Sequence, residues 1–513
     1  MNEPGGPSTG AVDVAGLLAS WLPRQRWFSA GHGGVTLSPA GQIMLVPPVP
    51  QPSHVEPATG EFALPTAVLA PQAAIDRKVG IVVHLISALP AGQSATGSST
   101  ATGAATYQVP LTYRSEPVPD LAHALLGELR TPDGPRYVYD APHDPDFVSA
   151  WTELIAGSGE AMSQAGTPRS RVRGVRRAGE APPDPHRAAK VLSGEQSNTS
   201  IIVGADGSDG SEPVMIKLFR VLQPGRNPDV VVPGALARAG NERVPRLVGW
   251  VEGEWVQPGG QPAWGHLSAA AEFVAGSADG WRVATSAVTN GETFAGLSSQ
   301  LGAATAAVHA ALAAALPTRP STPATLSALA EHLHQRLNWA LGAAPALAEY
   351  ADAARDVIDQ VSGLSEAPDL QIVHGDLHLG QALYSESRGW VLLDFEGEPL
   401  RPLAERGDPD LALRDVAGML RSFDYAARHS VLGLADDDPR SLAASTWAGE
   451  CREAYLNGYA TEAGRDPRQD GALLRALELD KALYEVVYET RHRPGWVEVP
   501  LRAVGRLLSR VHR

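Results

Sequence analysis

Two short apolar runs, each leading into an acidic residue, constrain this chain more than any other feature. Residues 369–375, DLQIVHG, predict a strand, and Asp376 follows it in a loop. Residues 389–397, GWVLLDFEG, predict a second strand with Asp394 at its end. Two strands that end in this way can bring both carboxylates to one site. Gln381 comes five residues after Asp376 and is expected in the turn that follows the loop.

The chain changes character near residues 275–280. Residues 11–74 carry short apolar runs broken by Pro and Gly, which predicts strands and loops, and residues 196–274 predict a small β-rich unit. Residues 292–317 instead place apolar side chains at three- and four-residue steps, which predicts a helix that ends at Pro317. We therefore expect an α+β chain with a hinge between a β-rich half and a helical half.

Composition limits the function classes. The 513 residues carry a net charge of −15, and the one basic cluster, residues 169–177, is best explained as a solvated loop, which argues against binding to nucleic acid or an anionic membrane. No run of about eighteen apolar residues exists, so we expect no membrane span. The single cysteine, Cys451, indicates a reducing compartment, and no signal peptide is evident. The expectation is a soluble, cytoplasmic protein with Cys451 buried on a helix.

The acidic residues of the two runs fit phosphoryl transfer. That chemistry needs one carboxylate to accept the proton of the acceptor hydroxyl, a second to hold Mg²⁺ against the phosphates, and a further oxygen to complete the metal shell. Asp376 fits the first role, Asp394 the second and the Gln381 amide the third.

A nucleotide-phosphate site is then required upstream. Residues 192–205, LSGEQSNTSIIVGA, form a small-residue turn before a strand, where backbone N–H groups can approach phosphates. Lys217 lies in an otherwise apolar strand, where its charge needs an anionic partner. Taken singly, an ordinary hairpin turn and an outward-facing lysine explain these features as well. The order of loop, lysine strand, hinge and two acidic loops favours the phosphate site.

These motifs resemble a known family. HGDLHLGQ and LLDFEGEP are similar to the catalytic and metal-binding loops of the aminoglycoside-phosphotransferase-like branch of the protein-kinase fold. Four further stretches resemble the actinobacterial maltokinases in particular: WLPRQRWF (21–28), GEQSNTS (194–200), RDVAGMLRSFDYAA (414–427) and YEVVYETRHRPGW (484–496).

The resemblance implies transfer of the ATP γ-phosphate to the anomeric hydroxyl of maltose, with Mg²⁺ as cofactor. The product, maltose 1-phosphate, feeds glycogen and other α-glucan synthesis. It also implies a bilobal kinase-like fold with an N-terminal cap (1–108), an intermediate nucleotide-binding part (109–275) and a helical C-lobe (276–513). A monomer or weak oligomer is expected, with a trehalose-pathway protein as a candidate partner.

The resemblance also implies roles for the residues of this chain that occupy the positions of the family's motif residues. Asp376 resembles the catalytic base, and Asp394 the chief Mg²⁺ ligand, assisted by Gln381 and, through water, Glu396. Implied nucleotide-binding residues are Gly194, Ser197, Asn198, Thr199, Lys217, Glu272 and Phe273, the last two as the hinge that meets adenine. Implied sugar-binding residues are His378, Tyr425, Glu489 and Arg491. His374 is expected to stabilise the loop rather than to react.

One departure from the family pattern concerns Lys217. Kinase-like folds pair this lysine with a helix glutamate, which relatives carry soon after the NPD sequence, but here Val231, Val232 and Pro233 follow. Pro233 also disfavours helix at the preceding residue. Neither Asp229 nor Glu242 has the expected spacing, so the sequence assigns Lys217 no partner.

Three alternatives stay open. The same loops could phosphorylate glucosamine, another hexose or an aminoglycoside. The missing glutamate suggests a sugar-binding pseudokinase. A metal-dependent hydrolase could use His374, Asp376 and His378 as ligands. Tyr484 and Tyr488 are offered as a sugar platform, although aromatic residues four apart on a helix are more often core.

Overall fold

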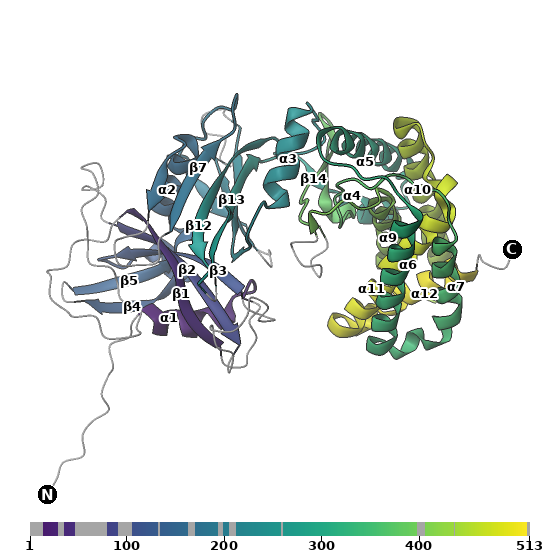
Figure 1. Ribbon diagram of the computed structural model, residues 1–513, viewed down its shortest axis with the longest axis horizontal. Coiled ribbons are helices and arrows are strands. Elements are labelled where there is room, and N and C mark those ends of the chain that lie inside the picture. The colour runs from purple at the N-terminus through teal and green to yellow at the C-terminus, as the bar shows by residue number, and fades with distance from the viewer. Residues whose placement is uncertain are drawn as a thin grey trace, which may run out of the picture. The chain divides into compact units, whose positions relative to one another are not determined.

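The chain folds into two compact units, which are described separately below (Figure 1). The computed structural model describes residues 14–28, 35–46, 79–90, 105–131, 134–162, 170–192, 198–204, 212–257, 260–397, 406–435 and 437–509. The first unit comprises residues 1–230 and 247–273, and the second comprises residues 231–246 and 274–513. The final crossing of the chain, between Phe273 and Val274, falls beside the change in composition near residue 275.

The first unit contains two antiparallel sheets. One has the order β1-β2-β3-β5-β4, with β11 paired to β3, and the other has the order β6-β7-β12-β13-β10-β9-β8. The strands of the first sheet are β1 (Val35–Val46), β2 (Val79–Pro90), β3 (Ala105–Arg114), β4 (Leu125–Thr131), β5 (Gly134–Asp140) and β11 (Val221–Leu222). Those of the second are β6 (Glu160–Met162), β7 (Arg171–Arg176), β8 (Ala189–Val191), β9 (Asn198–Val203), β10 (Val214–Phe219), β12 (Leu247–Val256) and β13 (Pro262–Glu272).

Strand β2 shows why the first sheet is buried on both faces. Successive side chains of a strand point to opposite faces. Ile81, Val83 and Leu85 therefore enter the core shared with α2 (Pro145–Ala156) and the second sheet. Val82 and Ile86 enter the core covered by α1 (Val14–Trp21). The near-continuous apolar sequence of β2 thus reflects burial on two sides.

The second unit is mainly helical and contains the small sheet β14-β15-β16. Its strands are β14 (Ala278–Asp279), β15 (Ala382–Ser385) and β16 (Gly389–Leu392). Its helices are α4 (Gly280–Asn290), α5 (Ala295–Ala315), α6 (Pro323–Ala343), α7 (Ala351–Ser362), α9 (Leu413–Ser430), α10 (Pro439–Ala463), α11 (Gly471–His492) and α12 (Glu498–Ser509). The expected α+β class is confirmed. Cys451 is buried on α10, as expected.

The apolar run before Asp376 is not a strand. Within it, only Leu370 and Gln371 pair with other backbone, in isolated bridges to Arg319 and Asp410. The prediction of a strand over 369–375 is therefore wrong. The physical reason is that the N–H groups at the end of the run bond to a side chain of α9, described below, and not to a neighbouring strand.

Three other local expectations need correction. Helix α1 lies in a region expected to hold only strands and loops. The first sheet continues to Asp140, so the cap boundary expected at residue 108 falls inside β3. Helix α3 (Pro228–Arg238) runs through Pro233, which was expected to interrupt it. Val232 and Leu236 are buried in the core of the second unit. Their burial stabilises the helix and offsets the one backbone hydrogen bond that proline removes.

No helix among the residues that the structure describes is both long and apolar enough to cross a membrane.

Candidate active site

A hairpin in the second unit brings Gln381 next to Asp394. Strands β15 and β16 pair Ala382 with Leu392, so the residues just outside the hairpin must also lie side by side. The Leu393 N–H donates to the Gln381 carbonyl at 2.8 Å, and Gln381 Nε2 donates to Asp394 Oδ2 at 3.1 Å. The closeness of the Gln381 and Asp394 side chains thus arises from one hairpin.

This pair has the chemistry and the spacing of a Mg²⁺ site. Magnesium prefers oxygen ligands at about 2.1 Å in octahedral geometry, which places adjacent ligand atoms about 3 Å apart. A half-turn of the Gln381 amide would present its oxygen at the position that its nitrogen occupies beside Asp394. The residues present therefore fit the ion that the sequence predicts.

Asp394 also has an unusual backbone. Its φ is +62°, in the left-handed region, which only two non-glycine residues of the described chain adopt. Such strain persists where the surroundings hold it in place, and it concentrates at functional sites. The strained turn aims the Asp394 carboxylate back toward the start of the hairpin.

The loop that carries Asp376 is held by a buried carboxylate of α9. Asp415 accepts hydrogen bonds from the backbone N–H groups of His374 at 2.7 Å and Gly375 at 2.8 Å, and from His309 Nε2 at 3.0 Å. Burial acts to raise the pKa of Asp415, but the His309 hydrogen bond and charge outweigh it and the pKa lies below its usual value. Asp415 therefore stays ionised and fixes the backbone just before Asp376.

The two histidines of the loop have structural partners. His374 Nε2 bonds to the Leu393 carbonyl at 2.6 Å, and its Nδ1 accepts from the Asp376 N–H at 3.4 Å, so the expectation that His374 stabilises the loop is confirmed. His378 Nδ1 accepts from the Gly380 N–H, and burial lowers the His378 pKa. Both ring nitrogens of His374 are thus engaged in hydrogen bonds within the loop region, which argues against its use as a zinc ligand.

Asp376 itself is paired with a lysine that the sequence did not single out. Lys481 Nζ lies 2.7 Å from Asp376 Oδ1, although 105 positions separate the two residues. Lys481 projects from α11, and both side chains are about one-fifth exposed, at 23% and 18%. The predicted proton acceptor therefore remains accessible while it is held by a charge-assisted hydrogen bond.

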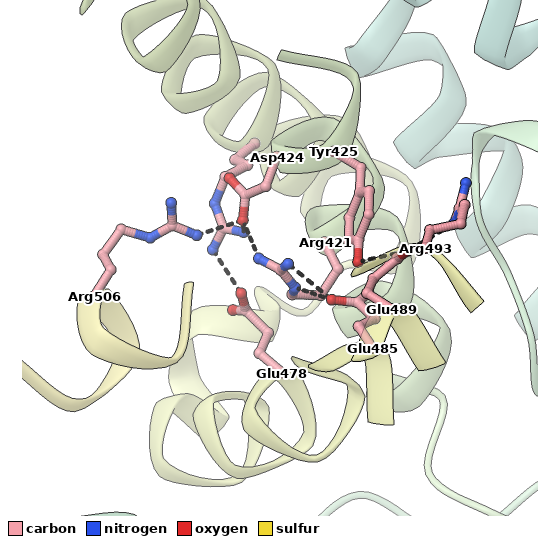
Figure 2. Close-up of polar contacts among 9 residues, drawn as sticks. Arg421, Asp424, Tyr425, Glu478, Glu485, Glu489, Arg493 and Arg506 are labelled. Carbon is pink, nitrogen blue, oxygen red and sulfur yellow. Dashed lines mark hydrogen bonds and ion pairs between the residues drawn. The ribbon is translucent and has the colours of Figure 1, made fainter. Parts of the chain in front are cut away.

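Beyond Lys481, the helices α9, α10, α11 and α12 share a buried ionic network (Figure 2). Arg421 donates to Glu485 Oε2 at 3.0 and 2.8 Å and to Asp424 at 2.7 Å. Asp424 also accepts from Arg506 and Arg452. Burial raises the pKa of Glu485, whereas three arginines overcome burial and lower that of Asp424. The network fixes α11 against α9.

The residues predicted to bind sugar separate into two groups. Tyr425 donates from its hydroxyl to Glu489 at 3.4 Å, and Arg493 donates to the same carboxylate at 2.6 Å, as Figure 2 shows. Arg491 instead stacks over Trp339 of α6, with its guanidinium carbon 5.6 Å from the ring centroid. The structure brings Tyr425 and Glu489 together and gives Arg491 a different partner.

An aromatic row follows Lys481 along α11. Its ammonium lies 5.3 Å from the centroid of the Tyr484 ring, which stacks with Tyr488 at 6.3 Å. Tyr488 then contacts His492 at 4.8 Å. Tyr484 is half-buried and Tyr488 is 37% exposed, so these rings are not core residues. Arginine side chains also lie against the row, Arg336 over the Tyr484 ring and Arg493 over the Tyr488 ring, each with its guanidinium carbon 5.5 Å from the ring centroid.

In the first unit, Lys217 has a partner after all. Its Nζ lies 2.7 Å from Asp229 Oδ2, and the two side chains are 16% and 7% exposed. Asp229 occupies the first turn of α3, and the conclusion that its spacing does not match was wrong. The pseudokinase alternative was suggested by the lack of a partner for Lys217. Because Asp229 is that partner, this reason for it no longer applies.

The other predicted nucleotide residues lie around β9 and β13. Asn198 and Thr199 begin β9, where the Thr199 hydroxyl accepts from Arg220 Nε at 2.8 Å. Glu272 ends β13, and the Phe273 N–H bonds to the Pro213 carbonyl. Gly194 and Ser197 lie outside the described residues. The roles of all these residues in nucleotide binding stay predictions.

Sequence reasoning gave no role to three charged residues at these sites: Asp415 and Lys481, which it did not single out, and Asp229, which it considered and set aside. Each has a signal in hindsight, because each is a charge in an apolar helical stretch, PDVVV, RDVAGML and DKALYEVV. Buried charges need partners. The sequence nevertheless does not say which residue the partner is.

The chain is similar in sequence to known proteins. Residues 65–144 match the sequence model of the maltokinase N-terminal cap domain. The chain is 32% identical to a glucosamine kinase of Streptacidiphilus jiangxiensis over 326 residues, 60% of this chain and 70% of that protein. It is 30% identical to a glucosamine kinase of Mycolicibacterium smegmatis over 344 residues, 63% of this chain and 80% of that protein.

The fold is shared over nearly the whole chain. A solved glucosamine kinase in complex with glucosamine, ADP and inorganic phosphate superposes with a TM-score of 0.60, covering 97% of this chain and 99% of that one at 24% identity. At this identity the superposition establishes the fold alone, and the two sequence relatives establish kinship. The chain belongs to the family of these glucosamine kinases, sugar kinases of the aminoglycoside-phosphotransferase-like branch that resemble the maltokinases.

Proposed function

We propose that this sugar kinase transfers the γ-phosphate of ATP to the anomeric hydroxyl of maltose. The observation that carries the proposal is the aromatic row on α11, because it begins at the lysine bonded to Asp376. A sugar whose hydroxyl lies at Asp376 would direct its second ring along Tyr484 toward Tyr488, whose exposed aromatic side chain can contact a pyranose ring.

The residues divide the reaction among them. Asp376 accepts the proton of the anomeric hydroxyl while that oxygen forms a bond to the γ-phosphorus, and the bond from phosphorus to ADP breaks. Lys217 would neutralise phosphate charge. Asp394 and Gln381, with Glu396 through water, would hold Mg²⁺, which supplies further positive charge against the phosphate oxygens. Maltose 1-phosphate and ADP leave, and Asp376 returns its proton to water.

The charge pattern supports a neutral acceptor. Glucosamine carries an ammonium group, which calls for a carboxylate without another cation. Among the described residues of α9 and α11, five carboxylates with little solvent exposure accept from arginine: Asp424, Glu478, Asp480, Glu485 and Glu489. Hydroxyl groups can share such pairs, whereas an ammonium gains little from them.

Glucosamine is the second candidate, because the two sequence relatives described above are glucosamine kinases. The deciding experiment measures ADP release with Mg²⁺-ATP and maltose, glucosamine, glucose or kanamycin, and identifies each product by ³¹P NMR. Turnover with maltose and an anomeric phosphate supports the proposal. Turnover with glucosamine alone removes maltose and keeps the kinase mechanism.

A further inference from the structure

We propose that Lys481 is a positioning residue for the predicted base: it holds the Asp376 carboxylate in the orientation that accepts the sugar proton. This inference rests on the proposed role of Asp376 and does not depend on which sugar is the acceptor. No motif of the sequence marks Lys481. It reaches the loop from α11, which lies more than a hundred positions further along the chain.

The first argument is the geometry of the pair. The hydrogen bond from Nζ to Asp376 Oδ1 is 2.7 Å long, within the range of strong charge-assisted bonds. It engages one carboxylate oxygen and leaves the other to the acceptor. A loop carboxylate without such a partner would sample several rotamers, and misplacement by about 1 Å can cost two orders of magnitude in rate.

The second argument is that buried side chains hold both segments of the pair, the loop before Asp376 and the helix that carries Lys481. On the loop side, Asp415 binds the backbone of His374 and Gly375. On the helix side, Asp480 precedes Lys481 and accepts from Arg336 at 3.1 Å and Arg414 at 3.0 Å. Asp480 is 3% exposed, so this anchor is inside the unit.

The third argument concerns the next turn of α11. Glu485 lies four residues after Lys481 and is bound by Arg421, which is 1% exposed (Figure 2). Because Arg421 binds Glu485, this carboxylate does not compete with Asp376 for Lys481. Helix α11 is thus fixed immediately before and one turn after the lysine, and surface lysines on mobile helices have no comparable support.

Three substitutions test the proposal with the acceptor that gives the highest turnover. Lys481→Met removes the charge and should lower kcat by about 100-fold with the KM for ATP unchanged. Lys481→Arg keeps a donor and should retain activity within about tenfold of the wild type. Arg355→Met, which removes an exposed ion pair to Asp352 on α7, is the matched control and should leave kcat unchanged.

A chemical rescue separates positioning from folding. Lys481→Cys should be as slow as Lys481→Met, and treatment with 2-bromoethylamine then rebuilds a side chain that ends in an ammonium. The natural thiol does not compete, because Cys451 is buried and its pKa is raised to about 12. Recovery of kcat by at least about tenfold is expected, which a purely structural role would not produce.

The outcomes distinguish the positioning role of Lys481 from the proposed base role of Asp376. If Asp376→Asn is inactive while Lys481→Met keeps kcat within about threefold of the wild type, the positioning role is overturned and the base stands. The same follows if the alkylated thiol variant stays inactive while remaining folded. If Asp376→Asn keeps full activity, the assignment of the base falls, and the inference falls with it.

Discussion

Among the described residues, each unit of this protein contains one lysine–aspartate pair with the same 2.7 Å contact, and the member with the proposed function is the lysine in one pair and the aspartate in the other. In the first unit Lys217 is the proposed phosphate ligand, and Asp229 supports it. In the second unit Asp376 is the proposed proton acceptor, and Lys481 supports it. If the proposed roles hold, the same kind of pair serves a cationic working residue in one unit and an anionic one in the other.

The two pairs also differ in how their partners are supplied. Asp229 comes twelve positions after Lys217, at the start of the next helix, so a local part of the chain completes the pair. Lys481 comes from a helix far along the chain, and an ionic network must hold that helix in place. The first pair is therefore the more local, and the second depends on the packing of the whole unit.

The largest effect is expected at the working carboxylate of the second pair. Asp376→Asn keeps the size of the side chain but cannot accept a proton, so kcat should fall by about a thousandfold. ADP release under saturating substrates measures it. Asp352→Asn, on the exposed surface of α7, serves as the control. Retention of a tenth of the activity in Asp376→Asn would contradict the role.

The supporting carboxylate of the first pair should matter less. Asp229→Asn removes the anion bound by Lys217, and the KM for ATP should rise about tenfold to a hundredfold, as for other lost bonds to a charged group. Asp229→Glu tests whether the residue type expected from the family restores it. Glu242→Gln is the control, since Glu242 is exposed. An unchanged KM in Asp229→Asn would mean that Lys217 needs no partner.

Acid should weaken β2 and β13 of the first unit before α9 and α11 of the second. Burial lowers the pKa of His84 and His266 to about 4, while unfolded histidine titrates near 6.5. The unfolded chain therefore binds more protons as the pH falls from 6.5 to 4, and each of these histidines costs up to about 3 kcal/mol of unfolding free energy. Asp415 and Asp424, with lowered pKa values, keep their contribution until below the ordinary carboxyl range.

Hydrogen exchange at pH 7, 5.5 and 4.5 reports this difference in the full chain. Peptides from β2 and β13 should lose protection before peptides from α9 and α11. His84 contacts the Tyr113 hydroxyl at 2.8 Å, and His84→Gln keeps a polar partner for it without a titratable ring. That variant should reduce the acid effect in β2. Simultaneous loss of protection in both units would refute the ordering.

The smallest effect is expected on the aromatic row. Tyr488→Ala removes one exposed ring, and the KM for maltose should rise about threefold to tenfold, in line with the modest value of single aromatic contacts. The KM for a monosaccharide should not change. Leu442→Ala removes another exposed apolar side chain, 57% exposed, and serves as the control. Equal effects on maltose and glucose would argue against a second sugar ring at Tyr488.

Much of the site was predictable wherever the relevant residues are neighbours in sequence. Gln381 and Asp394 flank one short hairpin, so the alternation of apolar and turn residues is enough to bring them together. Lys217 stands out as a charge in an apolar strand. The strand over 369–375 was wrong because composition cannot show that Asp415, about forty positions later, takes the N–H groups of its end.

The sequence by itself determined the fold class, the change from β-rich to helical architecture and the residues that carry the proposed chemistry, because these depend on local periodicity and on motifs. Only the tertiary structure decided which charges meet. Asp229 pairs with Lys217 from a helix that continues past Pro233, and Lys481 pairs with Asp376 from α11. Tyr488 stays exposed. Pairing between distant segments depends on how helices pack, and that packing is decided by burial summed over the unit rather than by any single stretch.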